Sequence, residues 1–228
     1  MQKDYDKKII ACLPAFNEEK TIANIIKKLK NYVDDVIVCD DGSSDMTSFI
    51  AKNSGAVLIR NSKNKGKGVA FDILFKEARR MNADVVVTLD ADGQHDPDDI
   101  PKIIKPILND DFDIVIGSRF LSNNNIPKHK LIGNYILNLL ANILSGSKFT
   151  DTQSGFRAYS KRALESIRIK ERDIGVDSQI IMDAVKMKLK VKEVPIRVYY
   201  NDLDTSTYNP IKHTLKVIKS VIKYKFIH

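Results

Sequence analysis

Short runs of aliphatic, mostly β-branched residues alternate along the chain with longer stretches in which apolar residues recur every three or four positions. The first pattern predicts buried strands and the second predicts amphipathic helices. Strands are predicted at residues 8–13, 35–40, 56–60, 84–90 and 112–117, and helices at 20–32, 44–55, 67–82 and 97–108. This alternation indicates an α/β fold with a mostly parallel central sheet and helices on both faces.

Two further segments have patterns of their own. Residues 129–146 form the most apolar predicted helix, in which two neighbouring apolar rows leave a narrow stripe of asparagines. Such a helix can be a core helix or a surface that faces a lipid. Residues 211–228 place five lysines beside an aliphatic stripe and contain no acidic residue. This segment, capped by Asn209 and opened by Pro210, resembles an interfacial helix; a helix packed on the sheet with solvated lysines is the alternative.

The chain has 228 residues, of which 43% are hydrophobic, and a net charge of +8. That size suffices for one α/β domain, which we place at residues 1–200, followed by a C-terminal extension at 201–228 that carries the basic helix. Cys12 and Cys39 lie in strand-like runs and are expected to be buried free thiols. Because the first residues are charged and no apolar run approaches the roughly 20 residues needed to cross a bilayer, we expect a cytoplasmic protein.

A cluster of carboxylates follows the predicted strand at 84–90. Asp90 and Asp92 lie two residues apart, and Gln94 follows two residues later. In parallel sheets, ligands bind outside the carboxyl ends of the strands, so the cluster lies at the functional edge. Oxygen ligands suit Mg²⁺ or Mn²⁺, and such a metal neutralises the charge on a departing diphosphate. The alternative is capping of the helix that begins at Pro97, which explains Asp96 but not Asp90.

Two common nucleotide sites are excluded by the loops that follow the strands. The first predicted strand is followed by PAFNEE and not by a Gly-x-Gly-x-x-Gly turn, so a dinucleotide site is not expected. No Gly-x-x-x-x-Gly-Lys-Ser/Thr sequence occurs, which excludes a P-loop.

Six motifs occur in order between residues 8 and 198: LPAFNEE, VCDDGSSD, NKGKGVA, LDADGQHDP, GSRF and DTQSGFRAYSKRAL. Each motif alone is weak, but most of them follow a predicted strand and their order is specific. Together they resemble the family 2 glycosyltransferases of the GT-A fold. More narrowly, they are similar to the dolichyl-phosphate mannose and glucose synthases.

The resemblance implies roles for individual side chains. Asp92, Arg119, Asp151 and Arg157 would act in catalysis, with the two arginines holding the two phosphates and Asp151 near the acceptor as base or orienter. Asp90, Asp92 and Gln94 would hold Mg²⁺ or Mn²⁺. The nucleotide-sugar would be bound by Pro14, Phe16, Glu18, Cys39, Asp41, Asp90, Ala91, Asp92 and Arg119.

One departure from the mannose synthases affects the choice of donor. Those enzymes carry an arginine and a lysine after EVPI, at positions where this chain has Asn201 and Thr207, unless Arg197, Lys212 or His213 substitutes. The form Asp-Thr-Gln-x-Gly-Phe at 151–156 is also closer to the glucose-type synthases. Both features favour a UDP-sugar over GDP-mannose.

We therefore expect a metal-dependent, inverting glycosyltransferase that moves a hexose from a nucleotide-diphosphate sugar to dolichyl or polyprenyl phosphate. It would work peripherally on the cytoplasmic face of a membrane, attached by its own helices or by an anchoring partner protein. The alternatives are a GDP-mannose-dependent synthase, a GT-A glycosyltransferase with a soluble acceptor, and a nucleotidyltransferase of the same fold. A basic nucleic-acid-binding module is the last alternative; it would leave the carboxylate cluster unexplained, so no nucleic-acid partner is expected.

Overall fold

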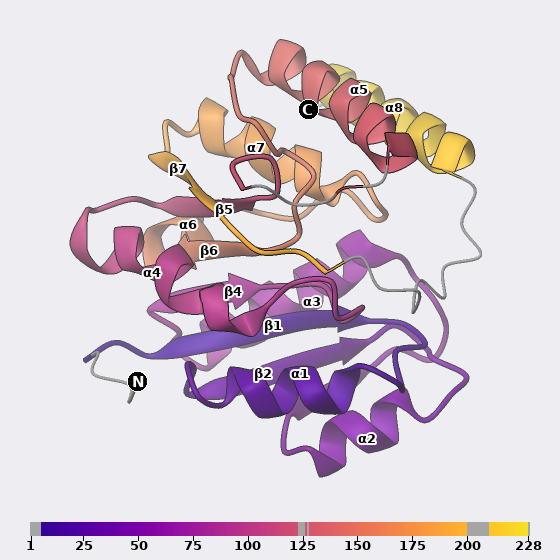
Figure 1. Cartoon of the computed structure of the whole chain (residues 1–228), viewed down its shortest axis with the longest axis vertical. Helices are drawn as coiled ribbons and strands as arrows, with labels where there is room; N and C mark the ends of the chain where they lie inside the picture. Colours follow the sequence, from indigo (N-terminus) through magenta and orange to yellow (C-terminus); the bar gives the residue numbers. More distant parts are fainter. Residues whose placement is uncertain (1–5, 123–125, 127, 200–209, 228) are drawn as a thin grey trace.

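Seven strands form one sheet in the computed structural model, which describes residues 6–122, 126, 128–199 and 210–227. The strand order is β3-β2-β1-β4-β6-β5-β7 (Figure 1). Every neighbouring pair is parallel except those of β6, which is antiparallel to both β4 and β5. The strands are β1 (Ile9–Ala15), β2 (Asp35–Asp40), β3 (Val57–Arg60), β4 (Val85–Thr88), β5 (Ile114–Ser118), β6 (Arg157–Ser160) and β7 (Val191–Pro195). The predicted mostly parallel sheet is confirmed.

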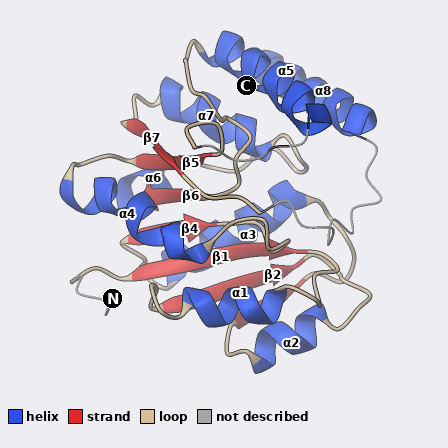
Figure 2. Ribbon diagram, viewed as in Figure 1, coloured by secondary structure: helices blue, strands red, loops and turns tan. Residues whose placement is uncertain are grey.

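Helices cover both faces of this sheet (Figure 2). Alternate residues of β1 explain why: Leu13 faces one hydrophobic cluster, whereas Cys12 faces the other. The first cluster lies under α1 (Ile22–Leu29), α2 (Thr47–Asn53) and α4 (Ile100–Asn109). The second lies under α3 (Lys67–Arg80), α6 (Lys161–Ser166) and α7 (Val176–Lys186). Cys12 and Cys39 are both buried and unpaired, as predicted.

The predicted helix at 97–108 consists of two parts. A 3₁₀ turn at Pro97–Asp99 precedes α4, and the Asp96 carboxylate accepts a hydrogen bond from the Asp98 amide at 3.1 Å. The capping role predicted for Asp96, with Pro97 at the first position, is confirmed.

Two long helices, α5 (Lys128–Ser145) and α8 (Pro210–Ile227), lie side by side at one end of the molecule (Figure 1). Together with α7 they enclose a third hydrophobic cluster, to which α5 contributes Leu137 and α8 contributes Val217, Val221 and Tyr224. The basic helix therefore packs on the protein along one side only. It begins at Pro210 as predicted, and Asn209 lies outside the described residues. Among the helices that the structure describes, none has both the length and the apolarity to cross a bilayer.

Candidate active site

The loops after β1 and β2 are joined by hydrogen bonds. The backbone N–H of Asn17 donates to Ser43 Oγ at 2.9 Å, and the backbone N–H of Glu18 donates to Thr47 Oγ1 at 2.7 Å. Asn17 adopts the left-handed backbone conformation (φ +58°), which asparagine tolerates better than most residues. This link fixes the first candidate nucleotide loop, in which Phe16 is 45% exposed and Pro14 is half-buried.

The two candidate nucleotide residues at the end of β2 have different surroundings. The Cys39 side chain lies in the hydrophobic cluster under α3, fully buried, so its thiol does not face the sheet edge. The predicted contact of this side chain with the base or ribose therefore lacks an accessible group. The Asp41 carboxylate lies at the edge and accepts hydrogen bonds from Asn61 Nδ2 (2.8 Å) and the Gly66 amide (2.8 Å). Asp41 thus fixes the loop that leads into α3.

Asp90 and Lys67 form the central ion pair of the edge. Lys67 Nζ lies 2.9 Å from Asp90 Oδ1 and 3.0 Å from Asp177 Oδ2, so one ammonium joins two carboxylates from distant segments. Burial alone would raise the pKa of Asp90, but the positive charge of Lys67 holds it below its ordinary value. A methyl group on Gly155 would lie 2.3 Å from Asp90 Oδ2, so only glycine fits there. The carboxylate of Asp90 is therefore ionised and fixed.

Asp92 and Glu18 form a second acidic group. Asp92 Oδ1 accepts a hydrogen bond from the backbone N–H of Gln94 at 2.9 Å. The pKa of Glu18 is raised to about 7, first by burial and then by repulsion from Asp92. A divalent cation would relieve this repulsion.

The donor set suits a metal that is shared with the substrate. Within the described ranges, no three His, Cys, Asp or Glu side chains are arranged to hold a metal by themselves. Mg²⁺ and Mn²⁺ bind oxygen ligands, and Mg²⁺ commonly completes its shell with water and phosphate oxygens. The carboxylates of Asp92 and Asp90 fit this partial role, and Gln94, whose backbone amide binds Asp92, has a half-buried side chain.

The segment after β7 crosses the carboxylate loop. The Tyr199 amide donates to the Gln94 carbonyl at 2.9 Å, and the Arg197 amide donates to Asp99 Oδ2 at 2.7 Å. The Arg197 guanidinium lies 3.1 Å from Asp96. Arg197 therefore stabilises the loop from its exposed side. Its guanidinium, which could have replaced the missing phosphate ligand, is already paired with Asp96 and Asp99. Asn201 and Thr207, and the side chains of Lys212 and His213, lie outside what the structure describes.

Arg119 and Asp151, predicted from two separate motifs, meet in a bidentate ion pair. Arg119 Nε and Nη2 each lie 2.7 Å from an oxygen of Asp151, and the Arg119 amide donates to the same carboxylate at 3.0 Å. The asparagine stripe of α5 holds the loop that carries Asp151, because Asn138 accepts from the Thr152 amide and Asn142 from the Phe149 amide. This geometry supports a role for Asp151 in orienting the guanidinium.

The structure departs from the sequence prediction at Arg157. Its guanidinium is fully buried and donates to the backbone carbonyls of Ser154 (2.8 Å), Asp177 (3.0 Å) and Thr152 (2.7 Å). No part of the side chain reaches a surface on which an acceptor phosphate could lie. Arg157 instead fixes the loop from Asp151 onward to the start of α7.

Sequence reasoning assigned no role to two residues of the site, Lys67 and His95. Lys67 belongs to the NKGKGVA motif and follows β3, so the strand-end rule does include it. His95 is buried between the two charged groups, and burial lowers its pKa to about 4, with Asp90, Arg119 and Asp151 nearby. The imidazole is therefore neutral at physiological pH. In the described part of the chain its Nδ1 has no hydrogen-bond partner.

A mostly parallel sheet with acidic and basic loops at its carboxyl edge is the architecture of the GT-A nucleotide-diphosphate-sugar transferases. A solved structure confirms the fold. Glucosyl-3-phosphoglycerate synthase from Mycobacterium tuberculosis, in complex with Mn²⁺, UDP-glucose and phosphoglyceric acid, superposes with a TM-score of 0.74 at 23% identity. The alignment covers 98% of this chain and 81% of that chain.

The chain belongs to glycosyl transferase family 2, which matches residues 10–168. It is 39% identical over 223 residues to an uncharacterized protein of Methanocaldococcus jannaschii, covering 95% of this chain and 92% of that protein. It is 36% identical over 243 residues to the UDP-N-acetylglucosamine–dolichyl-phosphate N-acetylglucosaminyltransferase of Methanococcus voltae, covering 96% of this chain and 97% of the relative. The predicted family is confirmed, and the protein is a glycosyltransferase.

Proposed function

We propose that the protein transfers a sugar from a nucleotide-diphosphate donor, with a UDP-sugar favoured, to dolichyl or polyprenyl phosphate. The observation that carries this proposal is the meeting of two charged groups at one sheet edge. Asp90 follows β4 and pairs with Lys67 at the start of α3, and Arg119 follows β5 and pairs with Asp151 in the loop before β6, with His95 close enough to feel the charges of both pairs. One group suits a metal-bound diphosphate, and the other suits a phosphate acceptor.

The transfer is a single displacement. An oxygen of the acceptor phosphate attacks the anomeric carbon, the bond from that carbon to the nucleotide diphosphate breaks, and the configuration inverts. A phosphate monoester has a second pKa near roughly 6 and is mostly dianionic at neutral pH, so it needs positioning more than deprotonation. Arg119, held by Asp151, would orient it in line with the donor.

The leaving diphosphate is stabilised by the acidic and basic loops together. A divalent metal held by Asp92, with Asp90 and Gln94 beside it, would neutralise the developing charge. Lys67 adds a half-buried positive charge next to Asp90. The Mn²⁺ complex of the mycobacterial structural neighbour supports a divalent cation in this fold.

The choice of donor and acceptor follows the most informative relative. The protein of Methanococcus voltae is named for UDP-N-acetylglucosamine and dolichyl phosphate, and it aligns along nearly its whole length. This agrees with the preference for a UDP-sugar drawn from the motif at 151–156. It also places an N-acetylated hexosamine beside a plain hexose among the candidate sugars.

The same proposal includes attachment to the cytoplasmic face of a membrane. The side of α8 that does not pack on α5 exposes Leu215 and Ile222 together with Lys219, Lys223 and Lys216, the last of which pairs with Asp173. Aliphatic and cationic side chains on one helix surface suit an anionic lipid interface.

The test is to incubate the protein separately with radiolabelled UDP-glucose, UDP-N-acetylglucosamine or GDP-mannose in the presence of dolichyl phosphate, 3-phosphoglycerate and Mg²⁺ or Mn²⁺, to count label in the organic phase, and to identify labelled products in the aqueous phase. Label from a UDP-sugar, lost in excess chelator and restored by metal, is the expected result. Label that stays in water on 3-phosphoglycerate, with none in lipid, would overturn the proposal in favour of a soluble acceptor.

A further inference from the structure

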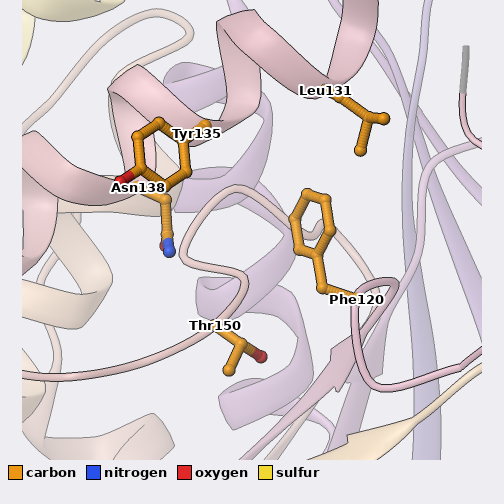
Figure 3. A pocket seen from close by; sticks show the side chains of 5 residues that line it. All are labelled: Phe120, Leu131, Tyr135, Asn138 and Thr150. Atoms are coloured by element: carbon orange, nitrogen blue, oxygen red, sulfur yellow. The ribbon is translucent and has the colours of Figure 1, made fainter. Parts of the chain in front are cut away.

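An apolar cavity of about 370 Å³ lies between α5 and two loops of the site. It is lined by Phe120, Leu131, Tyr135, Asn138 and Thr150 (Figure 3). Leu131, Tyr135 and Asn138 project from α5, and Phe120 and Thr150 come from the loops after β5 and before β6. Its volume is within the range of small-molecule pockets, which is roughly 300–1,000 Å³.

The cavity adjoins the Arg119–Asp151 pair through the chain itself. Phe120 directly follows Arg119, and Thr150 directly precedes Asp151. The guanidinium carbon of Arg119 lies 5.9 Å from the centre of the Phe120 ring. A cation therefore lies beside an apolar hollow, which is the arrangement that an anionic head group with an apolar tail requires.

An exposed apolar row continues from the cavity along α5. Leu131 (36% exposed), Tyr135 (68%), Leu139 (49%) and Ile143 (68%) are spaced four residues apart and so lie on one side of the helix. The first two also line the cavity. This row is not covered by α8, which packs against the side of α5 that carries Leu137.

We propose that the cavity binds the first isoprene units of the acceptor while its phosphate lies at Arg119. The inference rests on the proposed function and adds the site that recognises the lipid. Apolar walls with two aromatic rings match a methyl-branched hydrocarbon chain. The exposed row of α5 gives the rest of the chain an apolar path toward the bilayer. A small soluble phosphate would leave the cavity unfilled.

The experiment measures binding without transfer. Farnesyl phosphate, below the concentration at which it forms micelles, and ethyl phosphate are titrated separately into the protein by calorimetry. We expect farnesyl phosphate to bind at least a hundredfold more tightly, because only it fills the cavity. Leu131→Ala and Phe120→Ala should each lower the affinity for farnesyl phosphate by about tenfold and leave the affinity for ethyl phosphate unchanged.

Two matched controls remove the same groups outside the cavity. Leu121→Ala changes an exposed leucine beside Phe120, and Phe49→Ala changes an exposed phenylalanine on α2. Both should bind farnesyl phosphate as the wild type does. Tyr135→Ser is a third cavity variant, and Tyr135 is so exposed that this change is not expected to unfold the protein. It should also lower the affinity for farnesyl phosphate.

Equal affinities for the two phosphates, or cavity variants that bind farnesyl phosphate like their controls, would overturn the inference. The outcome is independent of the transfer assay. If the protein labels lipid phosphate but the cavity variants bind normally, the proposed function holds and the cavity assignment fails. If no sugar is transferred to lipid but farnesyl phosphate binding depends on Phe120 and Leu131, the cavity assignment holds and the proposed function fails.

Discussion

Two regions differ in how their side chains are satisfied: the proposed donor edge, formed by the loops after β1 to β4, and the proposed acceptor side, formed by α5, α8 and the loop that carries Asp151. At the donor edge the carboxylates are fixed by the chain: Asp41 binds backbone amides and Asp90 binds Lys67. On the acceptor side, large apolar groups such as Tyr135 and Leu139 face outward. The difference agrees with the proposed substrates, which are of opposite character: a water-soluble dianion on one side and a lipid on the other.

The two regions are connected by buried charge. Asp177, at the start of α7, accepts from Lys67 through its carboxylate and from Arg157 through its backbone carbonyl. Lys67 reaches the donor edge at Asp90, and Arg157 holds the loop that follows Asp151. A change at Asp177 should therefore disturb both regions, whereas a change at Lys67 or at Arg157 should disturb only the region that this residue contacts.

The largest effect is expected from Asp92→Ala at the donor edge. Because the change would remove a proposed ligand of the diphosphate-bound metal, transfer should fall by at least about a hundredfold while the protein stays folded. Initial rates with Mg²⁺ or Mn²⁺, together with circular dichroism, measure this. The exposed Asp98 provides the matched change Asp98→Ala, which should retain activity. Full wild-type activity in excess chelator would contradict the metal assignment.

Arg157→Ala tests whether the connection is structural. The change leaves three buried carbonyl groups without their donor, so the free energy of unfolding should fall by about 3 kcal/mol, measured with urea. Arg80 forms an exposed surface ion pair with Glu77, so Arg80→Ala should leave the free energy of unfolding nearly unchanged. An unchanged unfolding free energy with a raised Michaelis constant for lipid phosphate would instead return Arg157 to the acceptor site.

On the acceptor side, Lys216, Lys219 and Lys223 are replaced together by glutamate. Each lysine contributes about 1 kcal/mol near an anionic surface, so sedimentation with anionic vesicles should weaken at least tenfold. Activity on vesicle-embedded acceptor should fall more than activity on a short detergent-soluble acceptor. The same charge change at the exposed Lys27, Lys52 and Lys76 on α1, α2 and α3 should leave vesicle binding nearly unchanged. Equal losses in both triple variants would mean that net charge alone governs binding.

The smallest effect concerns Glu18 and pH. Its pKa in the folded protein is about 7, above the ordinary value of 4.5, so the folded state binds more protons than the unfolded state between these values. Stability of the metal-free protein should therefore fall as pH rises from about 5 to 8. Glu18→Gln should lessen this fall, measured as Tm in chelator, and Glu165→Gln on α6 should not. If Tm depends on pH in the same way in Glu18→Gln and in the wild type, the pKa of Glu18 is not raised by its surroundings.

The donor edge was largely predictable because parallel strands bring their carboxyl ends to one edge of the sheet. Residues as far apart as Glu18, Asp41 and Asp92 could be grouped from strand positions alone. The Arg119–Asp151 contact was not derivable in this way, because Asp151 precedes an antiparallel strand that the sequence did not predict. Only the structure brings that loop beside the end of β5.

The elements that escaped prediction carry polar residues whose burial depends on distant partners. β6 begins with Arg157, and the first turn of α7 contains Asp177, Ser178 and Gln179, all of them buried. Gln179 accepts from the Lys170 and Glu171 amides, and Asp177 binds Lys67. Judged by its local pattern, a run of polar residues predicts a surface segment. Because tertiary contacts supply hydrogen-bond and ion-pair partners for these polar side chains, α7 can instead be a core helix.

The antiparallel strand β6 also has a consequence for the order of assembly during synthesis. β6 separates β4 from β5, and the described neighbours of β5 are β6 and β7. When β5 leaves the ribosome, neither neighbour has yet been made. The first four strands can pair with one another, but β4 keeps an open edge until residues 157–160 emerge, several seconds later at roughly 5–20 residues per second. Open edges pair readily with other chains, so we expect the nascent protein to be most prone to aggregation in this interval.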